Sequence, residues 1–447
     1  MKKYDLLVIG AGPGGYAAAA HAAKQGLKTL LIEKQHLGGA CLNNGCIPVK
    51  TLLGAAHFLQ QIKKANLFNI KVEKAELDFN ALLDRKNRLI KRLQKGIEIF
   101  LRDSGVETLF GAAKLLPGKV VAVSPPSRGV ASASGSERTD LETSAEYTAD
   151  NIILATGSLP GAIPNLQPDG QWLLDNIQLL QNKTIPSALA VIGAGVIGLE
   201  FADLYSRLGS KVTLIDVLPE LLPQEDRAAV DLLQKSLERA GCRFLLNRKI
   251  EKAENKTLYL NDGQTIAAEI CLLAAGRRAN TDYILDPAVQ KTAKGFVSVD
   301  ENLQTSLSGV YAIGDLNNLA LYAHAATYQG LAVVDNLRQK SPRVINQTIM
   351  PRVIFTSPQI ASIGRYTSQC QQTPLSLLGR AQTENQTEGF LKLYTDEKDV
   401  IVGCVIVSEN ADALIGEAVA LINTRTKYTD LKNFIHPHPS WAEWFGL

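Results

Sequence analysis

Two cysteines in the stretch GGACLNNGCIPVK could carry redox chemistry. Cys41 and Cys46 lie five positions apart, and a regular helix would separate such residues by about 7.5 Å along its axis. A disulfide needs Cα atoms within about 7 Å of each other, so the pair can form a bridge only where the backbone departs from regular helix. Asn43, Asn44 and Gly45 lie between the cysteines, and these residue types tolerate such a departure.

Three interpretations of the cysteine pair remain open at this point. A zinc site would need further ligands at suitable spacing, and His36 and His57 stand isolated in the sequence. A pair of reduced thiols without a redox role is the second alternative. A redox-active disulfide fits best, because a close cysteine pair in a cytosolic protein is more often catalytic or metal-binding than structural. Pro48 suits the early turn of a helix that continues beyond the pair.

A second kind of candidate site occurs twice along the chain. LLVIGAGPGGYAAAAHAAKQGLKTLLIEK begins at residue 6, and LAVIGAGVIGLEFADLYSRLGSKVTLIDV begins at residue 189. Each copy starts with an apolar strand, passes through G-x-G-x-x-G into a helix, and ends with a second strand closed by an acid. Corresponding positions differ by 183 throughout (193 minus 10). The matched residues are Gly10, Gly12, Gly15 and Glu33 in the first copy, and Gly193, Gly195, Gly198 and Asp216 in the second.

This pattern is typical of dinucleotide binding. The first glycine permits a tight turn, the second lets the backbone approach a pyrophosphate, and the third lets the helix pack closely on the strand. The helix N-terminus then offers free N–H groups to the phosphates, and the acid accepts hydrogen bonds from ribose hydroxyls. Two copies predict two dinucleotides. Asp216 favours NAD over NADP at the second copy, because a carboxylate repels a 2′-phosphate.

The segment NFIHPHPSWAEWFGL near the C-terminus holds a candidate base. His436 and His438 alternate with Pro437 and Pro439, which hold the backbone extended. Glu443 follows His438 by five positions. A carboxylate bonded to one imidazole nitrogen fixes the tautomer and makes the other nitrogen a better base. The alternative is a surface histidine in a proline-rich tail.

Apolar runs predict the elements that position these groups. Strands closed by glycine turns are predicted at 151–160 and 270–281, and a buried strand at 309–316 ends near Asp315. The Ser-, Gly- and Pro-rich stretch 124–140 is predicted to be a surface loop. From about residue 346 onward, short strands alternate with a helix, which predicts a separate α+β domain. The apolar stripe of that helix consists of Leu414, Ile415, Ala418, Leu421 and Ile422.

Composition and charge narrow the class of protein. The 447 residues are 46% hydrophobic and 20% charged, as in ordinary globular proteins. The net charge is +3 without a polybasic run, so charge gives no reason to expect a nucleic-acid or membrane partner. The longest apolar runs fall short of the ~20 residues that span a bilayer. We therefore expect a cytoplasmic protein.

These residues resemble the flavin-dependent pyridine nucleotide–disulfide oxidoreductase family over essentially the whole chain. The resemblance rests on GAGPGG with Glu33, GGACLNNGCIPVK, ATGS, GAGVIGLE with Asp216, GRRANT, YAIGD, the FTSP strand and HPHPSWAE. CLNNGCIP resembles the branch that oxidises dihydrolipoamide rather than the branch that reduces glutathione disulfide. The resemblance implies an α/β fold with two Rossmann-like dinucleotide-binding domains, for FAD and NAD, and a C-terminal α+β dimerisation domain. The implied segments are 1–150 (FAD-binding), 151–279 (NAD-binding), 280–345 (central, FAD-binding) and 346–447 (interface).

The resemblance also implies a role for each candidate residue. Cys46 is the flavin-proximal thiol, and Cys41 is the interchange thiol that meets the substrate. His438 of the partner subunit, oriented by Glu443, is the base. The residues implied to contribute to the FAD site are Gly10, Gly12, Gly15, Glu33, Lys50, Ala113, Gly157, Asp315 and Ala323, with Lys50 paired to Glu200 near the flavin and Asp315 on the ribityl chain. The residues implied to contribute to the NAD site are Gly193, Gly195, Gly198, Glu200, Asp216 and Gly276. No metal site is implied.

The implied activity is oxidation of protein-bound dihydrolipoamide to lipoamide with NAD⁺, through a Cys41–Cys46 disulfide and FAD. The implied partners are a second copy of the chain, in a homodimer, and the lipoyl domain of a 2-oxo acid dehydrogenase or glycine-cleavage complex. Two alternatives are a related FAD- and NAD(P)H-dependent reductase of another low-molecular-weight disulfide, and a non-catalytic flavoprotein scaffold. A mercuric reductase would carry a further cysteine pair near its C-terminus, and no cysteine follows Cys404.

The chain departs from the family pattern at several positions. Val49 stands where Ser is usual, Ala279 where Pro is usual, and Ser440 where Thr is usual. TSPQ (356–359) and YAHAATYQG (322–330) also differ, and the tail is shorter than expected. None of these changes removes a cysteine, the histidine or an acid of the predicted site. We expect them to affect substrate preference, turnover and the edge of the dimer.

Overall fold

The computed structural model describes residues 2–125, 144–338 and 345–447. These residues form two units, and each unit is assembled from three separate stretches of chain. The stretches of the first unit are Met1–Val49, Asn80–Ala162 and Gly276–Gln347, and those of the second are Lys50–Phe79, Ile163–Ala275 and Thr348–Leu447. The four segment boundaries predicted from the sequence remain a prediction.

The first unit is built around a seven-stranded sheet of order β3-β2-β1-β6-β5-β4, with β17 paired to β6. β1, β2, β3, β6 and β17 pair in parallel, and their near-continuous apolar runs suit strands that are covered on both faces. β4 and β5 add an antiparallel edge. The strands are β1 (Lys2–Ile9), β2 (Thr29–Glu33), β3 (Glu107–Phe110), β4 (Ala112–Leu116), β5 (Val120–Ser124), β6 (Ala145–Leu154) and β17 (Val310–Ala312). Residues 126–140 of the predicted surface loop lie outside the described residues.

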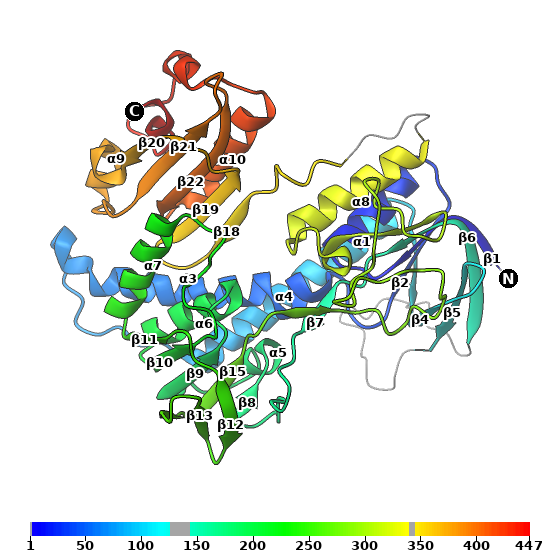
Figure 1. Cartoon of the computed structure of the whole chain (residues 1–447), viewed down its shortest axis with the longest axis horizontal. Helices are drawn as coiled ribbons and strands as arrows, with labels where there is room; N and C mark the ends of the chain where they lie inside the picture. Colours follow the sequence, from blue (N-terminus) through cyan, green and yellow to red (C-terminus); the bar gives the residue numbers. More distant parts are fainter. Residues whose placement is uncertain (1, 126–143, 339–344) are drawn as a thin grey trace. The chain divides into compact units, whose positions relative to one another are not determined.

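Helices α1 (Pro13–Lys24) and α8 (Ala323–Arg338) lie side by side in this unit (Figure 1). Small residues allow the close approach. A Cβ on Gly14 would lie 2.7 Å from the carbonyl oxygen of Ala326, and a Cβ on Gly330 would lie 2.7 Å from that of Gly14. Larger side chains at these positions would push the helices apart, so the sequence fixes α8 against the helix that follows the first glycine turn.

Two predicted strands are each divided by a glycine turn. The strand predicted at 151–160 consists of the end of β6 and of β7 (Ser158–Pro160), and the strand predicted at 270–281 consists of β15 (Ile270–Leu273) and β16 (Arg277–Ala279). β7 and β16 pair with each other in antiparallel orientation within the first unit. The remaining elements of this unit are α2 (Gly39–Asn44), most of α4 (Phe79–Asp103) and the 3-10 helix η2 (Gly314–Asn317).

The second unit contains a five-stranded parallel sheet of order β11-β10-β9-β15-β8 and a three-stranded antiparallel sheet of order β12-β13-β14. Helix α6 (Val196–Arg207) corresponds residue for residue to α1 at the 183-residue offset (196 minus 13). The other elements are β8 (Leu173–Leu174), β9 (Ala188–Ile192), β10 (Lys211–Ile215), β11 (Cys242–Leu245), β12 (Ile250–Glu254), β13 (Thr257–Leu260), β14 (Thr265–Ala267), α5 (Asn176–Leu179) and α7 (Arg227–Arg239).

The C-terminal part of the second unit is an antiparallel sheet of order β18-β19-β22-β21-β20 that packs against α10 (Ala411–Asn423) (Figure 1). The predicted apolar stripe of this helix packs in one core cluster with Trp444 and Phe445. The other elements are β18 (Arg352–Ile354), β19 (Gln359–Gly364), β20 (Gln369–Pro374), β21 (Phe390–Thr395), β22 (Ile401–Ser408), α9 (Gly379–Thr383), η3 (Leu375–Leu377), η4 (Tyr428–Asn433) and η5 (Ala442–Gly446). The predicted α/β class, with two dinucleotide-binding halves and a C-terminal α+β part, is confirmed.

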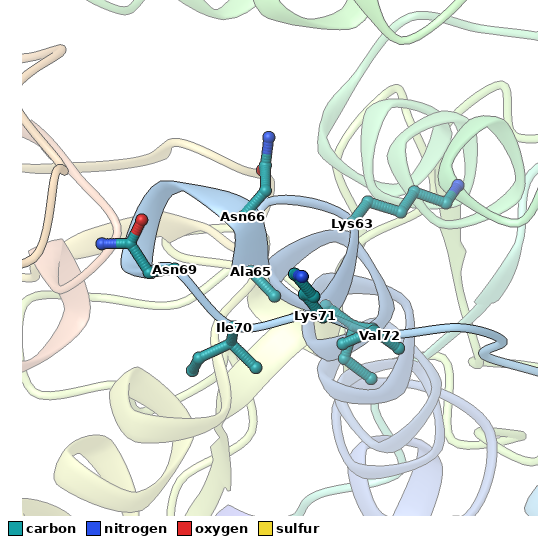
Figure 2. A pocket seen from close by; sticks show the side chains of 8 residues that line it. Lys63, Ala65, Asn66, Asn69, Ile70, Lys71 and Val72 are labelled. Atoms are coloured by element: carbon teal, nitrogen blue, oxygen red, sulfur yellow. The ribbon is translucent and has the colours of Figure 1, made fainter.

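Helix α3 (Cys46–Lys63) leads into the 3-10 helix η1 (Ala65–Phe68), where apolar side chains are exposed. Leu67, Phe68, Ile70 and Val72 are all exposed. Figure 2 shows Ile70 and Val72 on the chain that leaves this turn, beside a hollow of about 500 Å³. A cluster of exposed apolar side chains in a folded chain is typical of a protein–protein contact.

In the described part of the chain, no helix is both long and apolar enough to cross a membrane.

Asp226 joins α7 to the C-terminal sheet, and its removal should destabilise the second unit. It caps α7 at the Ala229 N–H (3.1 Å) and accepts bonds from Lys392 Nζ (2.8 Å) and Tyr394 Oη (2.7 Å). We expect Asp226→Ala to reduce the free energy of unfolding by about 3 kcal/mol, because the ammonium of Lys392, whose side chain is only 13% exposed, loses its partner. The midpoint of urea unfolding measures this loss. Asp231→Ala, which breaks an exposed pair on the same helix, should cost less than about 1 kcal/mol.

The same contacts predict a pH dependence. Burial alone would raise the pKa of Asp226, but the bonds from Lys392 and Tyr394 outweigh burial and lower it. A carboxyl with a lowered pKa stabilises the fold above its ordinary pKa, and this contribution is lost as the pH falls through the lowered value. The difference in stability between wild type and Asp226→Ala should therefore shrink in acid. A difference that stayed constant down to the acid unfolding transition would contradict this assignment.

Candidate active site

The two cysteines lie on either side of a break between two helices. Cys41 is in α2, and Cys46 is the first residue of α3. Gly45 makes the break, with φ −143° and ψ −110°, whereas Asn43 and Asn44 are helical. The predicted departure from regular helix is therefore present, but at Gly45 alone. A thiolate at Cys46 is favoured because it lies at the N-terminus of an 18-residue helix.

Contacts within the first unit hold the cysteine loop against the first glycine turn. The Gly38 N–H donates to the carbonyl oxygen of Ala11 (2.8 Å). Gly39 has φ +59°, and a Cβ there would lie 2.6 Å from the Cα of Gly12. This close approach requires glycine at position 39, whereas a Cβ on Gly12 would lie at an ordinary contact distance of 3.9 Å from the Cα of Gly39. The loop that carries Cys41 is therefore packed directly on the turn that would hold a pyrophosphate.

Asn43 fixes the loop from inside. Its Nδ2 donates to the carbonyl oxygens of Leu37 (3.0 Å) and Gly39 (2.8 Å). Its Oδ1 accepts a 2.5 Å bond from Nε2 of Gln94 on α4. The side-chain amide of Asn43 thus connects α2 to the turn that precedes it and to helix α4.

The other cysteines of the chain lie in different environments. Cys242, Cys271 and Cys404 are buried, and burial raises the pKa of each thiol, in the case of Cys242 to about 11. Such thiols stay protonated and unreactive. Cys41 and Cys46 are only partly buried, as a thiol that meets a substrate must be.

The two glycine turns have the same geometry. Gly10 and Gly193 both have φ +102°, and a Cβ at either would lie 2.6 Å from the carbonyl oxygen of the residue that follows the neighbouring strand. A Cβ on Gly15 would lie 1.9 Å from the carbonyl oxygen of Gly10. A Cβ on Gly198 would lie at the same distance from the carbonyl oxygen of Gly193. These four glycines are therefore required by the protein backbone itself.

The middle glycine of each turn is different, because it faces open space. A Cβ on Gly12 would meet nothing closer than 3.9 Å, and one on Gly195 nothing within 4 Å. Helices α1 and α6 begin immediately after these residues. Both turns thus leave room beside a helix N-terminus, which fits the pyrophosphate of a dinucleotide.

The two acids at the strand ends also have matching contacts. Glu33 accepts N–H bonds from Ala11 (2.8 Å) and Gln35 (2.7 Å). Asp216 accepts the corresponding bonds from Ala194 (2.7 Å) and from the N–H two residues after it (2.8 Å). Burial raises the pKa of Glu33, and these N–H bonds oppose that shift. Each acid is thereby held beside its glycine turn, where a ribose would lie.

Asp315 lies at the end of the first-unit sheet, in η2. Its Oδ2 accepts a short hydrogen bond from Oγ of Ser158 and lies 3.5 Å from Nε of Arg277. Arg277 Nε also donates to Oγ of Ser158 (2.6 Å). Sequence reasoning selected Asp315 but missed Ser158 and Arg277, which belong to the paired strands β7 and β16.

The remaining predicted residues of this unit are placed by turns and element ends. Ala323 is the first residue of α8, and Ala113 lies in β4. Gly157 (φ +65°) and Gly276 (φ +86°) make the turns before β7 and β16. A Cβ on either glycine would meet nothing within 4 Å. These two turns therefore also leave open space.

The second unit contains the predicted pair of Lys50 and Glu200. Lys50 Nζ lies 2.7 Å from both carboxylate oxygens of Glu200, whose side chain is 7% exposed. The Phe355 N–H donates to the same carboxylate (3.2 Å), and the ammonium lies 4.4 Å from the centre of the Phe355 ring. Lys50 follows Cys46 by four positions on α3, so one turn of helix separates the two residues.

The predicted base and its partner are also in contact. His438 Nδ1 lies 2.7 Å from Oε1 of Glu443, and the Ser440 N–H donates to the other carboxylate oxygen (2.7 Å). The N–H bond and the imidazole lower the pKa of Glu443, so its carboxylate stays charged. The His438 side chain is 79% exposed, which leaves Nε2 accessible.

The sequence of the whole chain matches one family. Residues 4–330 match the pyridine nucleotide-disulphide oxidoreductase family, and residues 350–446 match the dimerisation domain of that family. The chain belongs to the pyridine nucleotide-disulphide oxidoreductases. The antiparallel sheet β18-β19-β22-β21-β20 and α10 therefore correspond to the family's dimerisation domain.

Curated members of the family and solved structures cover nearly the full chain. The dihydrolipoyl dehydrogenase of Thermus scotoductus is 36% identical over 466 residues, which covers 99% of this chain and 96% of that protein. That of Chlorobaculum tepidum is 34% identical over 460 residues, with 99% and 95% covered. LpdA from Mycobacterium tuberculosis has the same fold, with a TM-score of 0.89 and 24% sequence identity. The match covers 100% of this chain and 98% of that one. The HOCl-induced flavoprotein disulfide reductase RclA from Escherichia coli has a TM-score of 0.83 and 26% sequence identity, and the match covers 99% of this chain and 98% of that one.

One polar network of this oxidoreductase was missed by sequence reasoning. His57, which stands isolated in the sequence, contacts Asp203 through Nε2 and Oδ2 (2.7 Å). The Asp203 side chain is 0% exposed and also accepts a 2.7 Å bond from Nε of Arg207. His57 follows Lys50 by two turns on α3, and Asp203 follows Glu200 by one turn on α6. Two buried carboxylates of α6, those of Glu200 and Asp203, thus accept the polar contacts from α3.

A second missed pair lies beside the candidate base. His436 Nε2 lies 2.8 Å from Oε1 of Glu417 on α10, and both side chains are mostly buried. The sequence singled out both histidines but could not tell which one turns inward.

Within residues 2–125, 144–338 and 345–447, no group of three or more His, Cys, Asp or Glu side chains could hold a metal ion.

Proposed function

We propose that this oxidoreductase has dihydrolipoyl dehydrogenase activity: it oxidises dihydrolipoamide to lipoamide and reduces NAD⁺, with FAD as its resident cofactor. The observation that carries the proposal is the packing of the loop of Cys41 and Cys46 onto the first glycine turn, through Gly39 and Gly12. This packing brings a redox-capable pair next to a site built for a dinucleotide. Full-length relatives named dihydrolipoyl dehydrogenase support the choice of substrate.

We assign FAD to the first glycine turn, because this turn and the cysteine loop belong to one unit. Gly12 leaves room for the pyrophosphate, and Gly10 and Gly15 shape the turn. Glu33 suits the ribose of the nucleotide half, and Asp315 suits the ribityl chain. Ala323, Ala113, Gly157 and Lys50 complete the proposed FAD contacts.

We assign NAD⁺ to the second turn, with Gly195 beside the pyrophosphate and Gly193 and Gly198 shaping the backbone. Asp216 favours NAD⁺, since it would repel the 2′-phosphate of NADP⁺. Val217 and Leu218, which follow it, are exposed and apolar and offer no cation for such a phosphate. Glu200 and Gly276 complete the proposed NAD contacts.

A pair of variants in the first turn should separate cofactor binding from folding. Gly12→Val places a side chain in the open space, so we expect a folded protein that loses at least ~90% of its bound FAD, on the scale of a lost phosphate contact. Gly15→Val forces a side chain into the Gly10 carbonyl and should prevent folding. Flavin absorbance and far-UV circular dichroism measure the two effects. A folded Gly12→Val protein with full FAD would contradict the proposed site.

The proposed reaction proceeds by thiol–disulfide exchange from the Cys41–Cys46 disulfide. His438 of the partner subunit accepts a proton at Nε2 from one thiol of the substrate. The resulting thiolate attacks Sγ of Cys41, the Cys41–Cys46 bond breaks, and Cys46 leaves as a thiolate. The second substrate thiol then attacks the substrate sulfur bound to Cys41, which closes lipoamide and breaks the bond to Cys41. His438 gives its first proton to the departing Cys41 sulfur and takes the proton of the second thiol, so Cys41 leaves as a thiol and Cys46 stays a thiolate.

Residues of the chain favour each of these charges. The N-terminus of α3 favours the thiolate of Cys46. The charged carboxylate of Glu443 favours the imidazolium that forms when His438 takes the proton. When bound, FAD and NAD⁺ supply the electron-accepting chemistry that returns the cysteines to the disulfide.

We propose a homodimer as the working form. Exposed apolar side chains at Phe434 and Ile435, next to the candidate base, support this, as do those at 67–72. Ile435 is 97% exposed in the single chain, which suits a residue that a second copy covers. We further propose the lipoyl domain of a 2-oxo acid dehydrogenase or glycine-cleavage complex as the substrate carrier. A cytoplasmic location, without nucleic-acid or membrane partners, remains a prediction.

Steady-state assays with two substrate pairs test the proposed activity. We expect rapid NADH formation from dihydrolipoamide and NAD⁺, and little oxidation of NADPH by glutathione disulfide. Faster turnover with glutathione disulfide would overturn the substrate assignment. It would favour instead a reductase of another low-molecular-weight disulfide, which the likeness to the disulfide reductase RclA makes the second candidate. A protein that binds FAD but reacts with neither pair would be a flavoprotein scaffold.

A further inference from the structure

Helix α4 carries a basic surface, which we define as the exposed side chains of Arg85, Arg88 and Arg92. These residues are three and four positions apart, so they share one face of the helix. Together with Leu89 they line a hollow of about 510 Å³. Three arginine side chains on one exposed face of a helix suit a partner that carries several carboxylates.

In the described part of the chain, no carboxylate forms an ion pair with the basic surface. Residues 84–95 contain six basic residues and one acid, although the whole chain has a net charge of only +3. Neutral residues interrupt the basic ones, so the sequence has no long basic run. The helix places Arg85, Arg88 and Arg92 on one exposed face, whereas Lys86 is buried. Among the described residues, no ion pair to Arg85, Arg88 or Arg92 is present. Arg88 and Arg92, four positions apart, repel each other in the free protein.

Helix α4 also contacts the redox loop, through its other face. Gln94, two residues after Arg92 and therefore on the opposite side of the helix, donates the 2.5 Å bond to Asn43, which lies between the two cysteines. Both residues belong to the first unit. A protein docked on the basic surface of α4 would therefore be bound to the helix that contacts the cysteine loop. Charge at such a place raises the rate of encounter with an oppositely charged partner.

We propose that the basic surface of α4 docks an acidic protein domain that carries the dithiol substrate. The proposal rests on the proposed function and specifies how a protein-bound substrate is recognised. Carboxylates on the domain pair with the three guanidinium groups, which relieves their mutual repulsion. A free dithiol has no such carboxylates, so the surface should matter only for the substrate that is attached to a protein.

The triple variant Arg85→Glu, Arg88→Glu and Arg92→Glu tests the proposal. We expect KM for a reduced, acidic lipoyl domain to rise by about tenfold or more, whereas kcat/KM for free dihydrolipoamide stays unchanged. The corresponding Arg→Gln triple variant, which removes charge without reversing it, should show a smaller rise. Bound FAD and circular dichroism verify that both variants fold.

A matched control changes the same net charge elsewhere. Lys183→Glu, Lys235→Glu and Arg243→Glu alter three exposed cations of the second unit, and we expect KM for the lipoyl domain to change less than about twofold. Raising the ionic strength should weaken the reaction of the wild type with the domain and leave that of the α4 variant nearly unaffected. An equal effect of both triple variants would overturn the proposal.

Direct binding separates this proposal from the proposed function. The oxidised lipoyl domain, titrated into the wild-type holoenzyme at low salt, should bind at least about tenfold more tightly than to the α4 triple variant, whatever the turnover. Equal binding overturns the docking surface even if dihydrolipoamide is oxidised. An RNA oligonucleotide that binds the surface more tightly than the domain at the same salt would also overturn it, in favour of a nucleic-acid site.

Discussion

Cys41→Ser and Cys46→Ser should each reduce NAD⁺-linked oxidation of dihydrolipoamide by a factor on the order of 10³ or more, because a serine hydroxyl cannot take part in disulfide exchange. Both variants should keep FAD. Neither side chain belongs to the first glycine turn, and the contact of Gly39 with Gly12 is unaffected. The measurements are steady-state turnover and the flavin content of the purified protein.

Cys370→Ser is the matched control for the two cysteine variants. Cys370 is the exposed cysteine of the described residues and lies in β20, outside the cysteine loop. Its replacement should leave turnover within about twofold of wild type, since isolated surface substitutions have small effects. If Cys41→Ser or Cys46→Ser retained more than about a tenth of wild-type turnover, the exchange mechanism could not stand.

His438→Gln should lower turnover by a factor on the order of 10² or more, because the substrate thiol loses its proton acceptor. Glu443→Gln keeps a hydrogen-bond acceptor for Nδ1 but removes the negative charge that favours the imidazolium. We expect a smaller loss, about tenfold. Steady-state turnover measures both losses, and an unchanged flavin content of the purified variants shows that the site is not distorted.

The contacts of Glu443 keep its carboxylate charged at neutral pH. The Ser440 N–H and His438 lower the pKa of Glu443 below its ordinary value of about 4.5. A carboxyl with a lowered pKa keeps its charge above that pH, so Glu443 should not titrate in the neutral range. His21→Gln serves as the control, since it removes another His–carboxylate pair between α1 and α8. Wild-type turnover in His438→Gln would contradict the assignment of the base.

The dinucleotide turns could be predicted from the sequence because they are local structures. The glycine spacing, the helix start and the acid all lie within about 30 residues, and their geometry is set by backbone sterics at Gly10 and Gly193. The repeat even predicts matching hydrogen bonds at Glu33 and Asp216. The contact of His438 with Glu443 is likewise local, since five residues separate them.

The remaining parts of the site depend on contacts between distant residues. His57 and Asp203 are 146 positions apart, and nothing in either segment indicates which face of α3 meets α6. Ser158 and Arg277 meet only because β7 and β16 pair across the chain. The basic surface of α4 was hidden for a related reason, because its residues are gathered only when the stretch is helical. A single sequence gives the helical periodicity but does not identify the neighbours of each face.

Chemical labelling of the cysteines before and after anaerobic reduction by NADH tests the redox pair most directly. In the oxidised protein we expect an alkylating reagent to leave Cys41 and Cys46 unlabelled, and after reduction we expect mass spectrometry to find both of them alkylated. Labelling of these two residues that is the same before and after reduction would contradict the claim that they store the electrons of the reaction.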